Sequence, residues 1–315
     1  MYRYRQLIHF FVFIILVGLT FDLGTTPVAN IKETPEIMEA VKTEDVLYKE
    51  IEAKAREFEE APQNAYIDRV WKKTPGRNGL QVNIEKSYDK MKDKGEFDKS
   101  LLVFDQVTPE KNLEELPASP IYRGHPEKQM VAFLINVSWG EEYVPEILSV
   151  LKDNNVKATF FIEGKWAKNN AELVKMIHEQ GHVIGNHAYN HPDMSRMTNQ
   201  QILDQIVQTN DIIKAIIGKS PKWFAPPSGS FNEHVVQVSH ELNMQTILWT
   251  VDTIDWKNPS VSVMINRVNT KIHPGATVLM HPTEATERGL DSLIKAIKAK
   301  ELKINTIEKL IESQR

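Results

Sequence analysis

The sequence predicts an α/β fold in which a mostly parallel sheet is closed, or nearly closed, into a (β/α) barrel. From Met130 onward, short apolar runs alternate with longer amphipathic stretches, as strands and their crossover helices do. The run VKATFF (156–161) has the composition of a buried strand, and the amphipathic stretch from Asn170 ends at Gly181. Polar residues follow several of the strands. Functional side chains of such folds lie where strands end, so a site is expected there.

Length and composition describe a globular protein. The chain has 315 residues, which is room for one large domain and one small one. Hydrophobic residues make up 41% and charged residues 25%, so a sizeable core can be buried. The net charge of −4 argues against nucleic acid as a partner. The absence of cysteine excludes disulfides and thiol chemistry.

The N-terminal residues 1–30 are predicted to be a signal peptide or signal anchor. Arg3 and Arg5 precede an apolar run from Leu7 to Phe21 that only His9 interrupts. The segment PVA (27–29) is a poor cleavage site, which favours a retained anchor. We therefore expect the rest of the chain to lie outside the cytoplasm, anchored in the membrane or secreted.

Three regions separate the anchor from the main domain. Residues 31–62 are charged and helix-prone and are predicted to form a stalk. Residues 63–107 are predicted to form a small α/β region, either a separate module or an extension of the main domain. It should contain helices over 66–73 and 85–92 and strands over 80–84 and 101–107. Residues 108–129 carry four prolines and are predicted to be a linker.

Residues 130–315 are predicted to form the main domain. The periodicity predicts strands over residues 131–137, 156–162, 183–185, 223–225, 246–252 and 276–280. It predicts helices over residues 145–152, 170–180, 199–218, 233–242, 261–271 and 290–300.

The loop GNHAYNH (185–191) is the strongest candidate for a functional site. His187 and His191 are four residues apart, so one turn or a tight loop can direct both imidazoles to one point. Imidazole is a common neutral ligand of zinc. Taken alone, this spacing is a weak signal that two surface histidines would also satisfy.

Five segments, taken together and in order, resemble the NodB-type polysaccharide deacetylases, carbohydrate esterase family 4. They are KATFF (157–161), GNHAYNH (185–191), FAPPSGSFN (224–232), DTIDW (252–256) and LMH (279–281). The resemblance covers roughly Met130 to Leu310. It implies a distorted (β/α) barrel that hydrolyses the N-acetyl groups of peptidoglycan or chitin-like sugars, and hence a cell-wall polysaccharide as partner.

The resemblance also implies roles for individual residues. His187 and His191 match two ligands of zinc or another divalent metal, and His281 matches the general acid. The carboxylate that tunes this acid matches Asp252 or Asp255, and the sequence leaves both open. The residues expected to bind substrate are Pro226, Pro227, Ser228, Trp256 and Leu279, together with Trp139, whose indole could fill the pocket or stack on a sugar ring.

The chain departs from the family where the chemistry is done. The family motif T-F-D-D-G aligns with NVSWG (136–140), so Ser138 occupies the position of the base aspartate and Trp139 that of the metal aspartate. Ala225 occupies the position of the arginine that pairs with the base. Ser228 replaces the usual tyrosine of the same motif, and Ala188 replaces the hydroxyl residue that usually follows the first histidine.

Two functions follow from these departures. The first is a deacetylase, a hydrolase of amide carbon–nitrogen bonds, with low or lost activity. The second is a catalytically silent protein that binds a cell-wall glycan or acts as a scaffold. Two imidazoles form an incomplete site, so we expect weak metal binding unless Glu141, Glu142 or Asp193 serves as a displaced ligand. A carboxylate within reach of the two histidines would distinguish the two functions.

Overall fold

The computed structural model describes residues 45–315. The predicted signal anchor and the first part of the predicted stalk lie outside these residues. Within residues 45–315, no helix is both long and apolar enough to cross a membrane. The described chain divides into two compact units, which we treat separately.

The smaller unit comprises residues 45–58 and Val82–Val103. Its helices α3 (Val46–Ala55) and α4 (Ile84–Met91) are followed by the short 3₁₀ helix η1 (Lys99–Leu101). Asp45 caps α3, because its side chain accepts the backbone N–H of Leu47 at 2.7 Å. Ile51 and Met91 are fully buried between the helices. Helical structure predicted for the stalk and for residues 85–92 is therefore confirmed here.

The predicted helix over residues 66–73 is wrong. This segment, which belongs to the larger unit, forms an antiparallel hairpin of β1 (Tyr66–Asp68) and β2 (Lys72–Thr74). The Asp68 carboxylate accepts the backbone N–H groups of Val70 and Trp71, each at 2.7 Å. An aspartate that bonds the backbone two and three residues on favours a turn over a helix. A second ribbon pairs β3 (Gly79–Val82) with β4 (Phe104–Val107).

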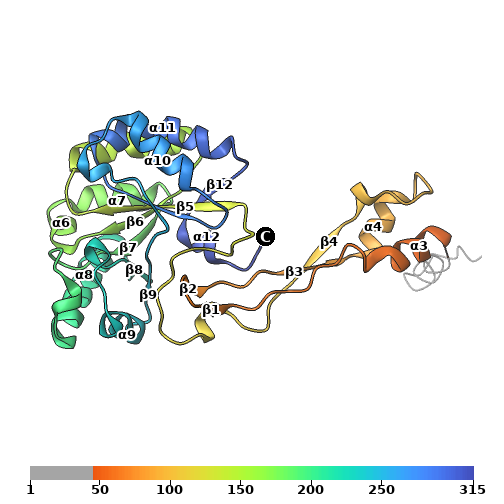
Figure 1. The fold of residues 1–315 in the computed structure, drawn as a ribbon, viewed down its shortest axis with the longest axis horizontal. Helices are drawn as coiled ribbons and strands as arrows, with labels where there is room; N and C mark the ends of the chain where they lie inside the picture. Colours follow the sequence, from red (N-terminus) through yellow and green to blue (C-terminus); the bar gives the residue numbers. More distant parts are fainter. Residues whose placement is uncertain (1–44) are drawn as a thin grey trace, which may run out of the picture. The chain divides into compact units, whose positions relative to one another are not determined.

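The larger unit is built on a curled, wholly parallel sheet that forms an open half-barrel (Figure 1). Its strands follow the order β10-β11-β5-β6-β7-β8-β9, and β12 also pairs with β5. Five strands lie where the sequence predicts them: β5 (Met130–Val137), β6 (Thr159–Ile162), β7 (Val183–Asn186), β8 (Trp223–Phe224) and β11 (Thr277–Met280). The strand β12 (Lys303–Asn305) belongs to the same sheet and was not predicted.

The predicted strand over residues 246–252 is corrected to two short strands. β9 (Gln245–Thr246) and β10 (Val251–Asp252) lie at opposite ends of the strand order, and residues 247–250 connect them. Ile121 accounts for the break, because it bonds Thr246 and Leu248 through its backbone, each at 2.8 Å. A single strand could not lie at both edges of the sheet.

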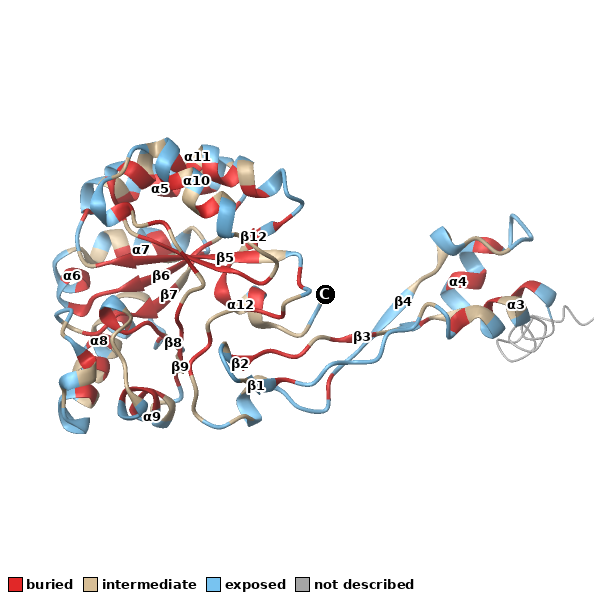
Figure 2. Cartoon of the chain, in the orientation of Figure 1, coloured by how far each residue is buried: buried red, intermediate tan, exposed pale blue. Residues whose placement is uncertain are grey.

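Helices cover the outside of the sheet (Figures 1 and 2). The predicted helices are confirmed as α5 (Val144–Asp153), α7 (Ala171–Glu179), α8 (Asn199–Ile217), α9 (Glu233–Glu241), α10 (Val261–Lys271) and α11 (Glu284–Lys298). The last begins at Glu284 rather than at Leu290, because Thr283 caps it through the N–H of Thr286. Short helices α6 (Gly164–Asn169) and α12 (Ile307–Ile311) were not predicted.

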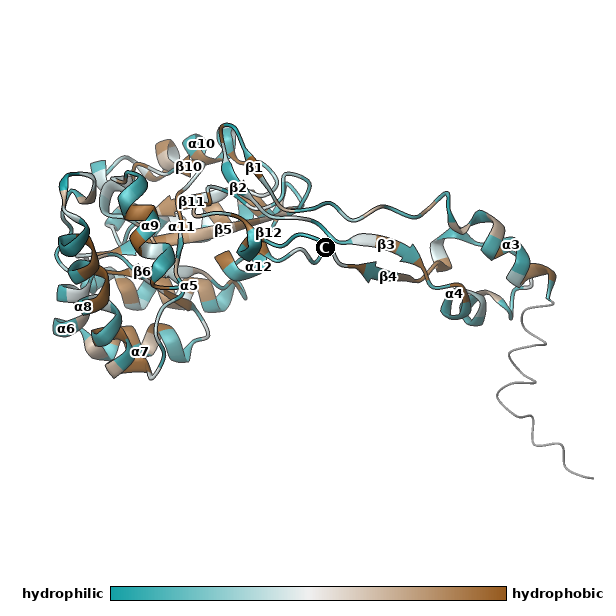
Figure 3. Cartoon of the chain, turned by 90° about the horizontal axis from the view of Figure 1, so that it is seen from below, coloured by the Kyte–Doolittle hydropathy of each residue, from teal (hydrophilic) through white to brown (hydrophobic). Residues whose placement is uncertain are grey.

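The central strand β5 separates two cores. Phe133, Ile135 and Val137 pack outward against the helices, whereas Ala132 and Leu134 face the interior of the half-barrel. This alternation follows from the two-residue repeat of a strand. Figure 3 shows apolar residues along the sheet, and Figure 2 shows that the central strands are buried. By the same repeat, Asn136 and Ser138 continue the interior face at the end of β5.

A buried histidine on the outer side should make stability depend on pH. His182 is 4% exposed, and its Nδ1 accepts the N–H of Ala158 at 3.1 Å. Burial lowers the pKa of His182 to about 4, and the Lys157 charge adds to the effect. The unfolded chain binds this proton near pH 6.5, so the stability that the neutral imidazole provides is present above pH 6.5 and lost as pH falls toward 4.

We expect His182→Asn, which keeps an acceptor but cannot be protonated, to reduce this loss. Between pH 7 and pH 4 the free energy of unfolding should fall by roughly 1–3 kcal/mol less in the variant than in the wild type. Urea unfolding at both pH values measures the difference. His187 titrates in the same direction, so only the comparison with the variant is informative. Equal pH dependence in the two proteins would contradict the prediction.

Candidate active site

A cavity of about 400 Å³ lies at the carboxyl ends of the strands. Nine residues proposed from the sequence line it: Ser138, Trp139, His187, His191, Ser228, Asp252, Trp256, Leu279 and His281. Asp255 lies behind His281, and Pro226 and Pro227 are buried in the adjoining loop and do not line the cavity. Asn136 and Trp249 line it without having been proposed. The sheet therefore brings most of the predicted residues to one place.

The two histidines of the GNHAYNH loop face each other. Their ring centroids are 5.2 Å apart, and the rings are nearly perpendicular. The Nδ1 of His187 lies 2.7 Å from the carbonyl oxygen of Ala225, so in the neutral ring Nδ1 carries the proton and Nε2 is free to accept. Burial lowers the pKa of His187 to about 3, and the neighbouring His191 adds to this. Both rings are neutral bases at physiological pH, since burial lowers the pKa of His191 too.

A strained loop holds this arrangement. Ala188 and His191 have positive φ angles of 59° and 56°, which residues with a Cβ rarely adopt. Asn186 stabilises the loop from below, because its side chain accepts the N–H of Ala188 at 2.8 Å and donates to the carbonyl of Ile206 at 2.8 Å. These hydrogen bonds hold the loop in the conformation in which both imidazoles line the cavity.

The structure distinguishes the two carboxylates that the sequence left open. Asp255 is fully buried and accepts the N–H of His281 at 2.6 Å, its ring Nδ1 at 2.8 Å and the hydroxyl of Thr286 at 2.7 Å. Asp252 lies on the cavity wall and accepts the N–H of Ile254 at 2.8 Å. Asp255 is therefore the carboxylate placed to orient the ring of His281.

Trp139 covers His281 on its other side. The two rings are stacked, with centroids 5.9 Å apart and an interplanar angle of 9°, and the indole remains 44% exposed. Gly140 makes this approach possible. Its φ is +80°, and a Cβ there would lie 2.1 Å from the carbonyl oxygen of Pro282, directly after His281. The loop after β5 is thus pressed against the loop after β11.

Two of the three carboxylates considered as displaced metal ligands are bonded to other residues, and the third is exposed. Glu141 accepts the indole N–H of Trp166 at 3.3 Å, and Glu142 is exposed. Asp193 accepts the hydroxyls of Ser195 and Ser230. Within residues 45–315, no group of three or more His, Asp or Glu side chains is arranged to hold a metal ion. The donor set of two imidazoles with an indole beside them does not fit a three-ligand zinc site.

A further carboxyl group, that of Glu163, was missed by sequence reasoning. It follows β6 and is 7% exposed, and its backbone N–H donates to the carbonyl of Val137 at 2.9 Å. Burial raises the pKa of Glu163, while the hydroxyl of Ser138 beside it and the Lys165 charge lower it. Only the sheet register places this residue next to the position of the absent base. No sequence motif contains it.

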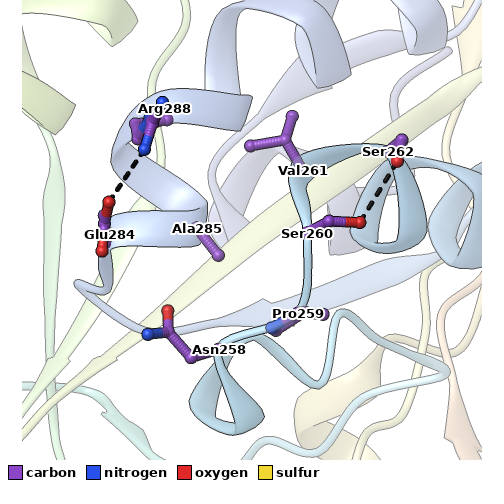
Figure 4. Close-up of a pocket in the computed structure, with 8 residues that line it drawn as sticks. All are labelled: Asn258, Pro259, Ser260, Val261, Ser262, Glu284, Ala285 and Arg288. Carbon is purple, nitrogen blue, oxygen red and sulfur yellow. Dashed lines mark hydrogen bonds and ion pairs between the residues drawn. The ribbon is translucent and has the colours of Figure 1, made fainter.

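A second cavity, of about 490 Å³, shares no residue with the first (Figure 4). It lies between the N-terminal ends of α10 and α11, and it begins at Asn258, two residues after Trp256. Its charged residues are paired, because Arg288 donates to Glu284 at 2.9 Å. The hydroxyls of Ser260 and Ser262 are 3.2 Å apart. Four of its polar side chains thus bond to one another in two pairs.

Known proteins that are similar to this chain include polysaccharide deacetylases. The family model described as polysaccharide deacetylase matches residues 123–247. The chain is 33% identical to a peptidoglycan-N-acetylglucosamine deacetylase of Bacillus cereus, over 62% of this chain and 72% of that protein. It is 49% identical to the protein YlxY of Bacillus subtilis over 99% of both. The chain therefore belongs to the polysaccharide deacetylase family.

The chain is also similar to solved structures. The chain is 50% identical to a CE4 family pseudoenzyme from Bacillus anthracis, with a TM-score of 0.82 over 85% of this chain and 96% of that chain. A mutant of the same pseudoenzyme, described as having restored enzymatic activity, is 49% identical with a TM-score of 0.82. That match covers 85% of this chain and 99% of the mutant chain.

The distinct surroundings of the two aspartates lead to a stability prediction. Asp255→Asn should lower the free energy of unfolding by roughly 1–3 kcal/mol, because an amide cannot accept from all three donors that the buried carboxylate satisfies. Asp252→Asn is the matched control. It keeps an oxygen for the N–H of Ile254 and should cost less than roughly 1 kcal/mol. Urea unfolding compares the two, and equal losses would show that Asp255 has no special role.

Proposed function

We propose that this protein binds an N-acetylated cell-wall glycan in the cavity and releases acetate from it at no more than a near-background rate. The observation that carries the proposal is the stacking of Trp139 on His281. The ring of the residue that aligns with the metal aspartate lies on the ring that aligns with the general acid. Exposed indoles at a cavity suit the apolar faces of sugar rings, and Trp256, which is 52% exposed, provides a second one.

The chemistry of residue 138 supports low activity. A positioned general base contributes ~10²–10⁴-fold to a rate, which is roughly 3–5.5 kcal/mol of barrier. Ser138 is un-ionised at neutral pH and cannot act as that base. Ala225, where the resemblance implies an arginine partner for the base, has no charge to leave unpaired. The changes at the two positions are thus consistent with each other.

The relatives support both parts of the proposal. Peptidoglycan-N-acetylglucosamine deacetylase is the name of a relative that is 33% identical to this chain over the aligned residues. A protein that is 50% identical over the aligned residues is described as a pseudoenzyme, and a mutant of it as having restored activity. From the name of the first relative we infer that this chain binds peptidoglycan. From the description of the second we infer that the activity of this chain is low.

A deacetylase of low activity is the second candidate function. The His281–Asp255 pair, with its 2.8 Å contact, favours it, because a positioned histidine is the side chain that most often serves as general acid or base. Glu163 beside Ser138 provides a carboxyl group close to the base position. Measured acetate release distinguishes this candidate from the first.

We also propose an extracytoplasmic location with a membrane anchor. The support is the basic flank of Arg3 and Arg5 before the apolar run Leu7 to Phe21, together with the position of wall glycans outside the membrane. Fractionation of cells that express the full chain tests this, and full-length protein in the cytoplasm would refute it.

The catalytic part of the proposal is tested by restoring the carboxylates. Acetate release from chitooligosaccharides or peptidoglycan should be near background for the wild type and should rise for Ser138→Asp with Trp139→Asp. Each single change should do much less, because base and metal ligand act on the same water as a unit. Adding Ala225→Arg should raise the rate further by orienting the new base. The assay is run with added zinc.

The control for this experiment is Ser138→Asn with Trp139→Asn, which has nearly the same shape without the charges. It should remain at background. Robust activity of the wild type that His187→Ala abolishes would show that the site is rewired, and the silent function would then be wrong.

The binding part is tested by removing the indole. Trp139→Ala should weaken the binding of tetra-N-acetylchitotetraose about tenfold, since loss of a stacked ring costs on the order of 1–1.5 kcal/mol. Trp139→Phe should keep most of the affinity. Trp71→Ala removes an indole outside the cavity and serves as the matched control. Titration calorimetry gives the affinities, and unchanged binding by Trp139→Ala would sink the assignment of this ring.

A further inference from the structure

The hairpin of β1 and β2 exposes apolar side chains that line neither cavity. It lies outside the half-barrel on the side of β9 (Figure 1), where the backbone of Lys72 pairs with that of Ile121. Tyr66, Ile67 and Val70 are 40%, 44% and 66% exposed. Single exposed apolar residues are normal on a protein surface, but several on one short hairpin indicate an interaction surface.

A guanidinium group beside this hairpin has no partner in the protein. The Cζ of Arg123 lies over the indole of Trp71, 5.3 Å from the ring centroid. The Arg123 side chain makes no hydrogen bond or ion pair with any of residues 45–315, although it is half-buried. Arginine carries a permanent charge and five N–H donors, and its planar group fits phosphate and carboxylate. The protein thus leaves a cation here that an external anion can pair.

Positive charge predominates around Arg123. Arg69 and Lys72 are exposed on the same hairpin, and with Arg123 they give three positive charges. The carboxylate of the hairpin, that of Asp68, accepts two backbone N–H groups of the turn. These bonds lower the pKa of Asp68, and the charges of Arg123 and Lys72 lower it further, so the three groups lie near one another. We call Tyr66, Ile67, Arg69, Val70, Lys72 and Arg123 the hairpin surface.

The composition of the hairpin surface indicates its partner. Aliphatic and aromatic residues next to arginine and lysine are typical of segments at the boundary between water and a lipid bilayer. Anionic headgroups attract the basic residues, and their phosphates fit a guanidinium group. A soluble anion would account for the charges but not for Ile67 and Val70. An anionic lipid surface accounts for both.

We propose that the hairpin surface docks on anionic phospholipid, with Val70 at the acyl boundary and Arg123 at the headgroup phosphates. This goes beyond the proposed function, because the hairpin surface shares no residue with the glycan cavity. The predicted anchor in residues 1–30 would attach the chain to the membrane, and the hairpin surface adds a second contact. Stable attachment generally takes two such signals.

A nitroxide label at residue 70 tests this contact in the full chain. The sequence has no cysteine, so Val70→Cys accepts a single label. The labelled chain is reconstituted into vesicles of phosphatidylglycerol and phosphatidylcholine in equal amounts. We expect the label to be accessible to oxygen and shielded from a water-soluble nickel complex. Val263→Cys on α10, a valine that is 51% exposed, is the matched control, and its label should stay accessible to the nickel complex.

Two charge variants test the part of the basic residues. Arg123→Gln should lower the ratio of membrane-contacting to free label about fivefold, as expected for the loss of one basic charge at an anionic surface. Arg69→Gln changes an exposed residue, so it keeps the fold if Arg123→Gln does not, and it should have a similar effect. Lys219→Gln, at an exposed position after α8, is the control and should change nothing. Vesicles of phosphatidylcholine alone should leave the label in water.

The possible results separate this inference from the proposed function. A chain that enters the anionic vesicles but keeps the label at residue 70 in water would overturn the inference and leave the anchor and glycan binding intact. Equal contact with both kinds of vesicle would overturn the role of anionic lipid. Immobilisation of the label by lipid-free poly(glycerol phosphate), without vesicle contact, would assign the surface to a soluble phosphate polymer instead. A chain that does not associate with vesicles would contradict both the anchor and this inference.

Discussion

The position of β5 at the centre of the parallel sheet is the constraint on which the site depends. This strand pairs with β6, β11 and β12, and seven of its eight residues are buried. Its two-residue repeat decides that Leu134, Asn136 and Ser138 face the interior. Because neighbouring strands fix this register, a change at residue 136, 138 or 139 alters the chemistry of the cavity and leaves the sheet as it is.

The residues of the cavity are consistent as a set. With serine at 138, tryptophan at 139 and alanine at 225, no charged group occupies the positions that the family resemblance assigns to the base, the metal aspartate and the arginine. Neutral imidazoles fit this environment, and burial favours their neutral form. One restored charge would have no partner, and an unpaired buried charge is strongly destabilising. The fold tolerates the loss of catalytic charge because the losses occur together.

Much of the fold could be predicted from the sequence, because parallel strands buried on both faces and their amphipathic helices have strong patterns. The errors fall where tertiary contacts decide. The hairpin over residues 66–74 depends on turn bonds of Asp68, and the break between Thr246 and Val251 depends on Ile121, more than a hundred residues away.

At the site, too, the sequence predicted the segments better than the individual residues. The motifs indicated which segments meet, and Ser138, Trp139, His187, His191 and His281 do line one cavity. Sequence could not separate Asp252 from Asp255, because both follow the same short strand and only the path of the loop buries the second. Asn136, Glu163 and Trp249 were missed as functional residues for a related reason. Their place at the site depends on strand register and burial, and these are visible only in the folded structure.

Glu163 forms part of the environment of residue 138. Its carboxyl group lies beside the Ser138 hydroxyl, and burial raises its pKa, so this part of the site resists negative charge. An aspartate at 138 would meet that carboxyl group without the arginine that the resemblance places at 225. Two carboxyl groups in one site compete for ionisation, which weakens a general base at neutral pH. The low activity proposed for this protein is therefore a property of the whole strand-end layer, and serine at 138 is the residue that this layer accommodates.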